Sequence, residues 1–475
     1  RSRVLTNGES IFDLRGRYAT LPQHFAASGY RTMGAGKLFH GSSGKYAKFF
    51  QAYGPGSGNQ GGPFTREELN TLQQNPMHSV DRGPGKLKAV LPMNGMPDVR
   101  RNGKSRNNSF DWGPVNVTAQ EMPDGQVADW ATRQLSNKSD QPFFMGVGFY
   151  RPHQPLFAPE KYFRPFPADQ MVLPNVKEDD LDDMSDYAAK LARFPLTAGS
   201  HAVVKQYGQW DDAVAGYLAC VHFIDELLGT VLDSLDESHY ADDTWIILLS
   251  DHGYHLGQKE HWGKLTPWHE STRVPLIMVP PKGWQQEGFQ AGMTIDRPVS
   301  LIDVYPTLVD ICGLSSPKHR LDGQSLRALL DGPTTSQPRF AVTTVGRGTF
   351  SVVSDQHRYI RFFDGSEQLY DRESDPLEWN NRINDPELQS IRSRLRGQVP
   401  EMPQVAHYVR YREWKAVLYA NSETPTELYS IQPGTGSGGG IGETRNVAND
   451  HPNVIKSIRA YLATHPTTTQ CITIE

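Results

Sequence analysis

Adjacent carboxylate and imidazole side chains occur at 250–253, where Ser-Asp-His-Gly directly follows the apolar run Trp-Ile-Ile-Leu-Leu at 245–249. Such a run is typical of a buried strand. Asp251 and His252 are therefore expected at its carboxyl end, where open α/β sheets place their ligand crevice. Both side chains can reach one divalent cation there. The pair could instead satisfy backbone N–H groups of its own loop, but the preceding strand and the flexible Gly253 favour metal binding.

The loop that continues from this motif is rich in positive charge. Residues 254–264 read Tyr-His-Leu-Gly-Gln-Lys-Glu-His-Trp-Gly-Lys and add two histidines and two lysines. A metal cation and lysine ammonium groups repel one another, so a cation site beside lysines implies that an anion binds among them. Taken alone, the same loop could be a solvated charged segment.

Two further polar motifs follow predicted strands. Phe-Tyr-Arg-Pro-His-Gln-Pro at 149–155 follows an apolar run, and its two prolines restrict the backbone around His153, as a positioned acid or base requires. Gly-Ala-Gly-Lys-Leu-Phe-His at 34–40 ends a short strand predicted at 30–35. Its glycines allow close backbone approach, and Lys37 is expected to point toward the crevice. The spacing of a phosphate-binding loop, G-x-x-x-x-G-K-S/T, is absent here.

The elements that must position these motifs alternate between helix and strand from about residue 119 to 280. An apolar run spans 142–149, one long helix with an apolar face spans about 210–232, and strand-like runs follow at 245–249 and 274–279. Near-continuous apolar strands separated by helices indicate a mainly parallel sheet covered on both faces. Because the carboxyl ends of parallel strands meet at one edge, the polar clusters on three strand ends are predicted to face a single crevice.

Composition argues against several functional classes. The chain has 475 residues with 48 Lys and Arg against 53 Asp and Glu, a net charge of −5, so no basic excess suggests a nucleic-acid partner. No stretch approaches 18 consecutive apolar residues, so no membrane span is expected. Three cysteines, Cys220, Cys312 and Cys471, make no disulfide framework. The first two fall in apolar helical patterns, which predicts that they are buried.

The character of the chain changes in two places. Residues 41–118 are rich in Gly, Pro and Asn and are expected to run over the surface. After about residue 337 short strand-like runs dominate, and a partial repeat, L-Y followed by E-x-x-N, occurs at 369–381 and 428–446. We expect both copies to lie in one small antiparallel sheet, closed by a helix near 451–463.

Taken in order along the chain, these motifs resemble those of the formylglycine-dependent (type I) sulfatases of the alkaline phosphatase superfamily. The closest likeness is to bacterial sulfatases of the iduronate-2-sulfatase type. Residues 36–40 are similar to that group's G-K-x-F-H, and 151–153 to its K/R-P-H. The block 250–277 is similar to S-D-H-G-x-x-L-G…K…R-V-P-L-I, and 369–380 to L-Y-D-L-x-x-D-P-x-E-x-N. The matches run from residue 1 to about 381 in the family's order.

The resemblance implies an α/β fold of the alkaline phosphatase type. A large, mainly parallel sheet is sandwiched by helices, and a smaller C-terminal antiparallel α+β subdomain follows it. On this basis we expect a catalytic domain over 1–336 and a C-terminal subdomain over 337–475.

The start of the chain departs from the family's pattern. The family signature, C-x-P-S-R-x-x-x-L-T-G, contains the cysteine that is converted to formylglycine. Arg1 falls on the signature arginine and Leu5-Thr6 on its L-T, while Asn7 replaces the usual glycine. The nucleophilic cysteine then belongs four residues upstream of Arg1, and the family's two adjacent Asp metal ligands belong further upstream. The chain therefore resembles a sulfatase truncated at its own signature, lacking its first strand and its nucleophile segment.

The resemblance also implies roles for residues of this chain. Asp251 and His252 correspond to ligands of the family's Ca²⁺, although His is a less usual ligand for so hard a cation. Lys37 and Lys264 would place compact positive charges on sulfate oxygens. His153 would donate a proton to the leaving oxygen or bind the sulfate.

Two more residues complete the catalytic set, since Arg1 and His40 would orient the formylglycine hydrate. The implied substrate is a sulfated carbohydrate or another sulfate ester. A formylglycine-generating enzyme or an anaerobic maturase is the implied partner during biogenesis. Bacterial members are typically periplasmic or secreted, so the same localisation is expected here, although no signal peptide opens this sequence.

Two other functions compete with this interpretation. A metal-dependent phosphodiesterase or phosphonate monoester hydrolase of the same superfamily also carries S-D-H-G. The two-zinc type needs further His and Asp ligands, and both the Arg1…Leu5-Thr6 remnant and the D-P-x-E-x-N motif favour a sulfatase. A non-catalytic sulfoglycan-binding protein is the other alternative, and it requires that residue 1 be the true start.

Overall fold

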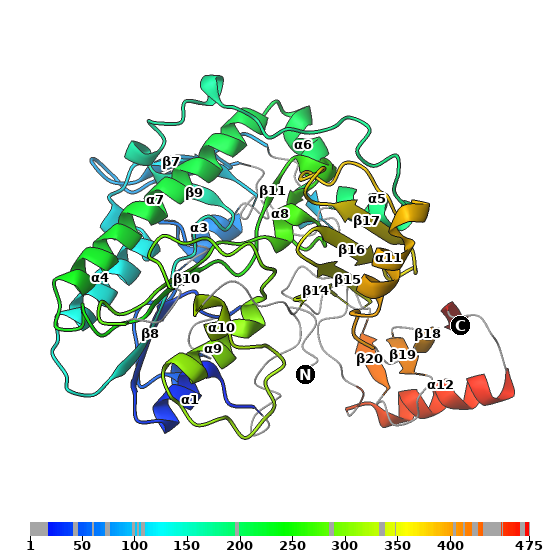
Figure 1. The fold of residues 1–475 in the computed structure, drawn as a ribbon. Coiled ribbons are helices and arrows are strands. Elements are labelled where there is room, and N and C mark those ends of the chain that lie inside the picture. Colours follow the sequence, from blue (N-terminus) through cyan, green and yellow to red (C-terminus); the bar gives the residue numbers. More distant parts are fainter. Residues whose placement is uncertain are drawn as a thin grey trace. The chain divides into compact units, whose positions relative to one another are not determined.

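The computed structural model describes the chain from residue 18 onward, with several gaps (Figure 1). The described residues are 18–40, 46–58, 61–71, 77–96, 100–101, 104–105, 110–194, 199–284, 289–331, 338–346, 348–401, 405–411, 414–419, 426–430, 448, 450–465 and 471–474. They form two compact units. The large unit contains Tyr18–Arg339 together with Ser374–Asn381, and the small unit contains Phe340–Glu373 and the described residues from Arg382 onward. The segment 374–381, which the sequence analysis placed in the C-terminal subdomain, thus belongs to the large unit.

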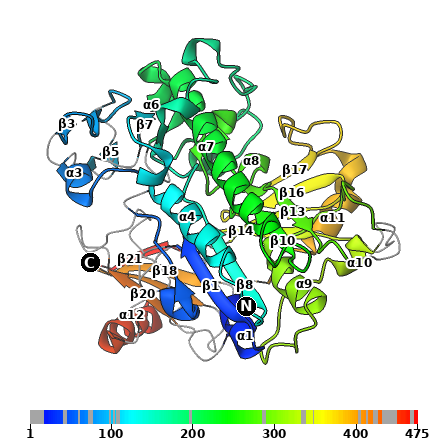
Figure 2. The same ribbon diagram turned by 90° about the vertical axis from the view of Figure 1, so that its left-hand side faces the viewer.

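A parallel sheet forms the first layer of the large unit. Its order is β2-β1-β8, with β1 (Arg31–Gly36) between β2 (Ala52–Tyr53) and β8 (Phe143–Gly148). Both pairings are parallel, and Gly36 of β1 lies opposite Gly148 of β8. Helix α4 (Pro123–Leu135) contacts both β1 and β8, and Figure 2 shows it beside the long helix α7 (Trp210–Asp236). The predicted α/β class, with its parallel sheet covered by helices, is confirmed.

The strand before the Ser-Asp-His-Gly motif lies in a second sheet. Strand β10 (Ile246–Leu249) pairs with β13 (Leu276–Val279), and the pairing is antiparallel. The expectation from the sequence that β13 runs parallel is therefore wrong. A parallel pairing needs a crossover that returns the chain to the opposite end of the sheet. The connection here, residues 250–275, contains the hairpin β11 (His255–Leu256) and β12 (Trp262–Gly263), a 3-10 turn at Gln258–Glu260 and the short helix α8 (His269–Thr272), and no long crossover helix.

Strand edges remain open in both of these sheets. Among the described residues, β8 pairs only with β1, and β10 pairs only with β13. Leu249 of β10 is 41% exposed, and Ile277 and Val279 of β13 are 52% and 45% exposed. Aliphatic strands that are open at an edge and exposed on a face are unusual in native proteins, because they lose burial and invite further pairing.

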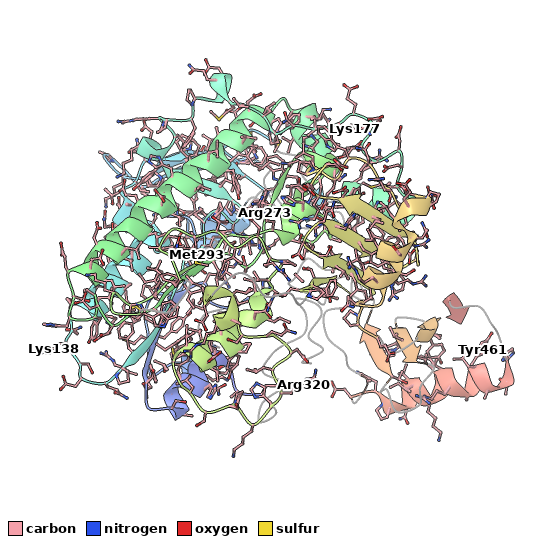
Figure 3. All side chains as sticks on the ribbon, in the orientation of Figure 1. Lys138, Lys177, Arg273, Met293, Arg320 and Tyr461 are labelled. Carbon is pink, nitrogen blue, oxygen red and sulfur yellow. The ribbon has the colours of Figure 1, made fainter. Side chains whose placement is uncertain are left out.

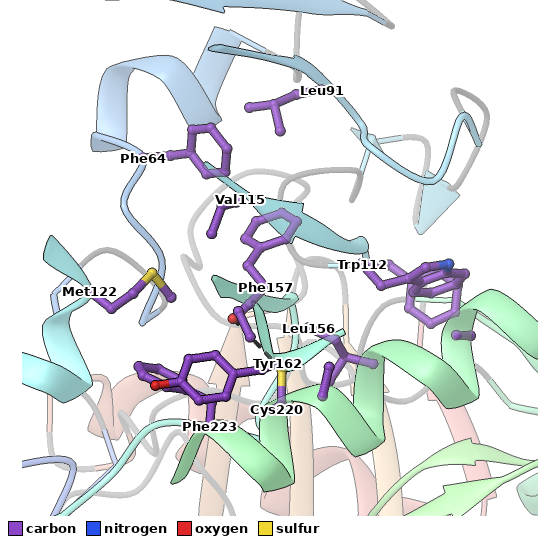
Figure 4. Close-up of a cluster of buried hydrophobic side chains, with 14 of the residues drawn as sticks. Phe64, Leu91, Trp112, Val115, Met122, Leu156, Phe157, Tyr162, Cys220 and Phe223 are labelled. Atoms are coloured by element: carbon purple, nitrogen blue, oxygen red, sulfur yellow. Dashed lines mark hydrogen bonds between the residues drawn. The ribbon is translucent and has the colours of Figure 1, made fainter. Parts of the chain in front are cut away.

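The main hydrophobic core of the large unit lies between α7 and a second pair of parallel strands, β7 (Trp112–Val115) and β9 (Leu156–Pro159). Figure 4 shows Phe157 and Leu156 above Phe223 and Cys220 of α7. Phe64 and Leu91 also lie in this core, at 1% and 0% exposure. The prediction that 41–118 runs over the surface is therefore wrong in part, because apolar residues of that segment pack onto β9 without any periodic pattern in the sequence.

Helix α7 illustrates the difference between an apolar helix and a membrane span. It is the one described helix that is long and apolar enough to cross a membrane by length and composition. Nine of its residues, including Ala219, Cys220 and Phe223, are buried against the rest of the unit. A core helix meets the same criterion. The buried Cys220 confirms the prediction for that cysteine, and Cys312, just after helix α9 (Val304–Ile311), is partly buried.

Short elements complete the large unit, and Figure 3 draws the side chains on the ribbon where their placement is described. They are α1 (Leu21–Ala27), α3 (Arg66–Thr71), β3 (His78–Asp81), β4 (Lys88–Leu91), β5 (Arg100–Arg101), β6 (Lys104–Ser105), α5 (Asp186–Arg193), α6 (His201–Gln206) and α10 (Arg327–Leu330).

The small unit contains one antiparallel sheet and one mixed sheet, in which β18 pairs in parallel with β21, and each sheet has its own helix and its own core. The first is the meander β14 (Ala341–Val345), β15 (Thr349–Val353), β16 (His357–Arg361) and β17 (Glu367–Asp371), against which α11 (Gln389–Arg396) packs. The second has the order β20-β19-β18-β21, with α12 (Pro452–Thr464) beside it. Its strands are β18 (Val405–Tyr411), β19 (Trp414–Tyr419), β20 (Glu427–Ser430) and β21 (Cys471–Ile474).

The internal repeat is therefore divided between two sheets. The first L-Y pair lies in β17 and the second in β20, so the expectation of one shared sheet is wrong. The helix α11 and the core that it closes separate the two sets of strands along the chain. The second E-x-x-N copy, at 443–446, lies outside the described residues. The closing helix predicted near 451–463 is confirmed as α12.

Candidate functional site

A tight turn at the end of β1 directs Lys37 toward the Ser-Asp-His-Gly motif. Gly36 has φ of +74°, and a Cβ at this position would lie 1.9 Å from the carbonyl oxygen of Gly148. Only glycine fits such a close approach in this conformation. The backbone N–H of Lys37 donates to the same Gly148 carbonyl at 2.7 Å. The Lys37 ammonium then lies 3.4 Å from Oδ2 of Asp251.

His153 is held by a buried carboxylate that the sequence analysis missed. Asp124, at the start of α4 and 0% exposed, accepts the backbone N–H of Tyr150 at 2.6 Å and that of Arg151 at 3.3 Å. The Arg151 guanidinium donates to the carbonyl oxygens of Phe157 at 2.7 Å and of His153 at 3.2 Å. An acid in the first turn of a helix ordinarily signals only a favourable interaction with the helix dipole, so nothing in the sequence pointed to this contact.

The His153 ring has a defined orientation. Its Nδ1 lies 2.7 Å from the carbonyl oxygen of Gln154, which can only accept, so Nδ1 carries the hydrogen. Nε2 is then the ring nitrogen that is available to take up and donate a proton. Burial lowers the pKa of His153 well below its usual value, and the charges of Lys264 and Lys37 lower it further. The ring is therefore neutral at pH 7 when no anion is bound.

Hydrogen bonds to backbone groups hold the motif at 250–253 in place. The N–H of Gly253 donates to the carbonyl of Ser271 at 2.9 Å, and a Cβ at Gly253 would lie 1.9 Å from the Glu270 carbonyl oxygen. Nδ1 of His252 donates to the Gly253 carbonyl at 2.8 Å. Nε2 of His252 therefore accepts from the ammonium of Lys264, at 2.7 Å.

The structure brings together six of the seven residues predicted for the site. Direct contacts join Lys37 to Asp251 and Lys264 to His252. His40 and His153 belong to the same cluster, because the charges of Lys37 and Lys264 act on both rings. The six are Lys37, His40, His153, Asp251, His252 and Lys264. Arg1 lies outside the described residues.

The cluster carries excess positive charge and is only partly buried, since the Asp251 side chain is 66% exposed and that of Lys37 is 19% exposed. Burial lowers the pKa of Lys264 to about 8, with a further contribution from Lys37 and an opposing one from Asp251. Burial likewise lowers the pKa of His252 to about 4, which leaves it neutral. Burial opposes the ionisation of Asp251, but His252, Lys37 and Lys264 together hold its pKa below the usual value. Two ammonium groups against one carboxylate favour an anion as the ligand.

The described residues supply only part of a calcium site. Asp251 offers one carboxylate and His252 one nitrogen, and Oδ1 of Asp251 lies 3.4 Å from Nε2 of His252. No group of three or more His, Cys, Asp or Glu residues that could hold a metal occurs in the described part of the chain. Ca²⁺ takes six to eight oxygen ligands. These residues alone therefore do not fit the metal, and the assignment of Asp251 and His252 as ligands stays a prediction.

Buried histidines near the site make stability depend on pH. His255 is 0% exposed with a pKa lowered mainly by burial, and burial lowers the pKa of His201 to about 4. In the unfolded chain both rings bind a proton near pH 6.5. Between pH 6.5 and about 4 the unfolded state therefore holds more protons, so stability rises with pH across this window and falls as pH is lowered.

We expect the free energy of unfolding to decrease on going from pH 7 to pH 5, as measured by urea denaturation. His201→Phe removes one titrating ring and should flatten this dependence, whereas His239→Gln, at an exposed position, should not. Equal stabilities at pH 7 and pH 5 contradict the prediction.

Comparison with known proteins identifies the family. The Sulfatase family matches residues 2–314, and the family described as N-sulphoglucosamine sulphohydrolase, C-terminal, matches 257–405. A sulfatase of Formosa agariphila is 33% identical over 392 residues, which cover 80% of this chain and 69% of that protein. Human iduronate 2-sulfatase is 27% identical over 349 residues, which cover 64% of this chain and 56% of that protein. The chain thus spans little more than half the length of the human enzyme.

Solved structures share the fold. A phosphonate monoester hydrolase from Silicibacter pomeroyi aligns with a TM-score of 0.61 and 20% identity, over 84% of this chain and 81% of that one. A protein solved in complex with its substrate D-glucosamine-2-N,6-O-disulfate aligns with a TM-score of 0.55 and 18% identity, over 82% of this chain and 84% of that one. These likenesses show a common fold, and the sequence matches show the family: the chain belongs to the sulfatases.

Proposed function

We propose that this chain hydrolyses sulfate monoesters on a sulfated carbohydrate, with a formylglycine nucleophile supplied from upstream of Arg1 and with a calcium ion. The observation that carries the proposal is the gathering of Lys37, Lys264 and His153 around Asp251 in one partly buried, positively charged cluster. A sulfate monoester bears one negative charge spread over three oxygens. Two compact ammonium groups are well suited to hold such a group and to stabilise the charge that develops on it.

The residues of this chain account for binding and proton transfer. Lys37 and Lys264 hold the sulfate oxygens, and Asp251 keeps the Lys37 ammonium in place at 3.4 Å. The formylglycine would supply the attacking hydroxyl. As the new S–O bond forms, the bond from sulfur to the sugar oxygen breaks, and that oxygen must take up a proton.

His153 is the group best placed to deliver this proton. Its ring is neutral while only lysines surround it. A bound sulfate adds negative charge beside the ring and raises its pKa, so Nε2 takes up a proton when the substrate is present. Binding of the sulfate ester therefore favours the protonated form of His153, which is the acid that the leaving oxygen needs.

The open strand edges support an upstream segment in the same protein. Among the described residues, the unpaired edges of β8 and β10 and the 41% exposed Leu249 of β10 are features that one further strand would cover. The two Asp ligands that the family places upstream would add the oxygen donors that Asp251 and His252 lack. Both points fit the expectation that the nucleophile and the missing ligands lie before Arg1.

The substrate class can be tested with the protein extended upstream and co-expressed with a maturing enzyme. We expect calcium-dependent sulfate release from sulfated uronic acids and hexosamines, measured by ion chromatography, since iduronate 2-sulfatase is among the relatives. Phosphonate monoesters and phosphodiesters serve as comparison substrates, because a phosphonate monoester hydrolase shares the fold. Turnover of these esters faster than any sulfate ester contradicts the proposal.

A further inference from the structure

The loop that carries Lys264 has a conformation that needs external support. Three of its non-glycine residues have positive φ: Lys259 at 57°, Glu260 at 50° and Leu265 at 70°. Residues other than glycine adopt this region only at an energetic cost. Contacts outside the loop must therefore hold it in place.

The first support is a buried ion pair that no step of the proposed reaction uses. The Lys259 ammonium lies 2.6 Å from Oδ1 of Asp180, and the two side chains are 1% and 3% exposed. The same ammonium donates to the backbone carbonyl of Glu378. Removing two charges from water costs about as much as their attraction returns, so such a pair is poorly explained by stability alone. Its effect is to fix the position of the groups that it joins.

The second support is the segment 374–381, here called the strap, which belongs to the large unit although the chain on either side of it belongs to the small one. Glu378 is 1% exposed, has φ of 56°, and its Oε2 accepts the backbone N–H of His269 at 3.1 Å. Asn381 donates from its backbone N–H to the carboxylate of Asp183 at 2.7 Å and from its side chain to the Asp183 carbonyl at 3.1 Å. Glu378 of the D-P-x-E-x-N motif, and Asn381 just after the motif, thus bind the strap to two other segments of the large unit.

Short and rigid connections lead from Lys259 to Lys264. The hairpin β11–β12 pairs Leu256 with Trp262, and Trp262 is 1% exposed. The ring of His261 lies 2.6 Å from the Ala192 carbonyl oxygen through Nδ1, and 3.0 Å from the carbonyl oxygen of Lys264 itself through Nε2. Because these contacts fix the backbone between the two lysines, a change in the position of Lys259 also shifts Lys264.

We propose that Asp180 and Lys259, together with Glu378 of the strap, are positioning residues that hold Lys264 against His252 in the anion-binding cluster. The inference rests on the proposed function for the role of Lys264 itself. It gives the strap a task in the chemistry of the large unit.

The test uses Lys259→Met, which keeps most of the side-chain length and removes the charge, and Asp180→Asn, which keeps the shape. Hydrogen exchange of the amides at 257–265 reports on the loop directly, and titration calorimetry with inorganic sulfate reports on the cluster. Each single substitution leaves a buried partner uncompensated, so we expect at least tenfold faster exchange in the loop and at least tenfold weaker sulfate binding. The double variant should exchange more slowly than either single variant.

Two controls separate positioning from general destabilisation. Lys282→Met removes an ammonium from an ion pair with Asp242 in which both side chains are largely exposed, and it should change neither readout. Leu135→Ala creates a cavity at the far end of α4, about 16 Å along that helix from Asp124. It should lower the melting temperature without speeding exchange selectively at 257–265. Glu378→Gln keeps the backbone carbonyl and should give a smaller effect than Lys259→Met.

The two proposals fail in different ways. Lys259→Met with unchanged exchange in the loop overturns the positioning role, whatever the sulfate affinity. Lys264→Met with unchanged sulfate affinity counts against the proposed anion site. In that case, faster loop exchange in Lys259→Met still supports the link between Lys259 and the backbone of Lys264.

Discussion

Residues 1–475 expressed alone should release sulfate from an aryl sulfate or a sulfated sugar at no useful rate, several orders of magnitude below the rate of the extended and matured protein. The three cysteines, Cys220, Cys312 and Cys471, are not followed by x-P-S-R, so none of them can become formylglycine. Cys220 is also unsuited to nucleophilic chemistry, because burial raises its pKa to about 12. Loss of a covalent nucleophile from a concerted site typically costs several orders of magnitude in rate.

The matched experiment adds the upstream segment with its cysteine, in cells with and without the maturing enzyme. We expect sulfatase activity only when the segment, the cysteine and the maturing enzyme are all present. Replacing that cysteine by alanine should return the rate to that of residues 1–475. Turnover by residues 1–475 alone would mean that the nucleophile lies elsewhere in this chain.

The same extension has an expected effect on stability. A further strand paired with the open edge of β10 would cover aliphatic surface beside that edge, such as Leu249, which is 41% exposed. Each large aliphatic side chain that passes from water to the core contributes about 1.5–3 kcal/mol when burial is complete. Activity and fold are thus linked in the proposal, because one segment would supply both the nucleophile and the missing sheet contacts.

The parts of the fold that could be predicted are those set by local pattern. The apolar runs at 142–149 and 245–249 are strands in the structure, and the long periodic segment is α7. The polar motifs that follow them lie at the ends of those strands. This is why Lys37, His153 and Asp251 could be expected in one place before any coordinates were known.

The parts that could not be predicted depend on pairing over long distances. A run such as 276–279 has the same composition whether it lies parallel or antiparallel to its neighbour, so its direction could not be read from the sequence. The two L-Y pairs look alike, yet β17 and β20 lie in different sheets. Each of these two strands lies in a sheet with its own helix, α11 or α12, and each helix closes a separate hydrophobic core.

Buried charged residues are the feature that is hardest to predict from a single sequence. Lys259 stands between Gln258 and Glu260 and has the appearance of a solvated residue, whereas the structure leaves it 2% exposed. Its partner Asp180 lies 79 positions away. Asp124 could not be identified from the sequence either, because many exposed acidic residues lie at the start of a helix. In the structure its carboxylate accepts a backbone N–H in the loop that carries His153. These positioning contacts appear only when the fold is known.

Lys264→Ala and His153→Ala, each made in the extended and matured protein, should lower kcat/KM for a sugar sulfate at least about a hundredfold. This is the scale of one electrostatic or acid–base contact in an active site. Lys264 donates to His252 at 2.7 Å, so its loss removes a charge on the sulfate and also frees a neighbouring ring. Lys282→Ala, at an exposed ion pair, is the matched control and should leave kcat/KM unchanged.

The choice of leaving group separates the two roles open to His153. A nitrophenolate departs without help, whereas a sugar alkoxide must be protonated as the S–O bond breaks. If His153 is the acid, His153→Ala should cost far more with the sugar sulfate than with nitrophenyl sulfate. Equal losses on both substrates indicate that the ring binds the sulfate instead. Lys264→Ala should cost the same on both substrates in either case, because both carry the same sulfate group. A loss of less than tenfold for both variants contradicts the assignment of the site.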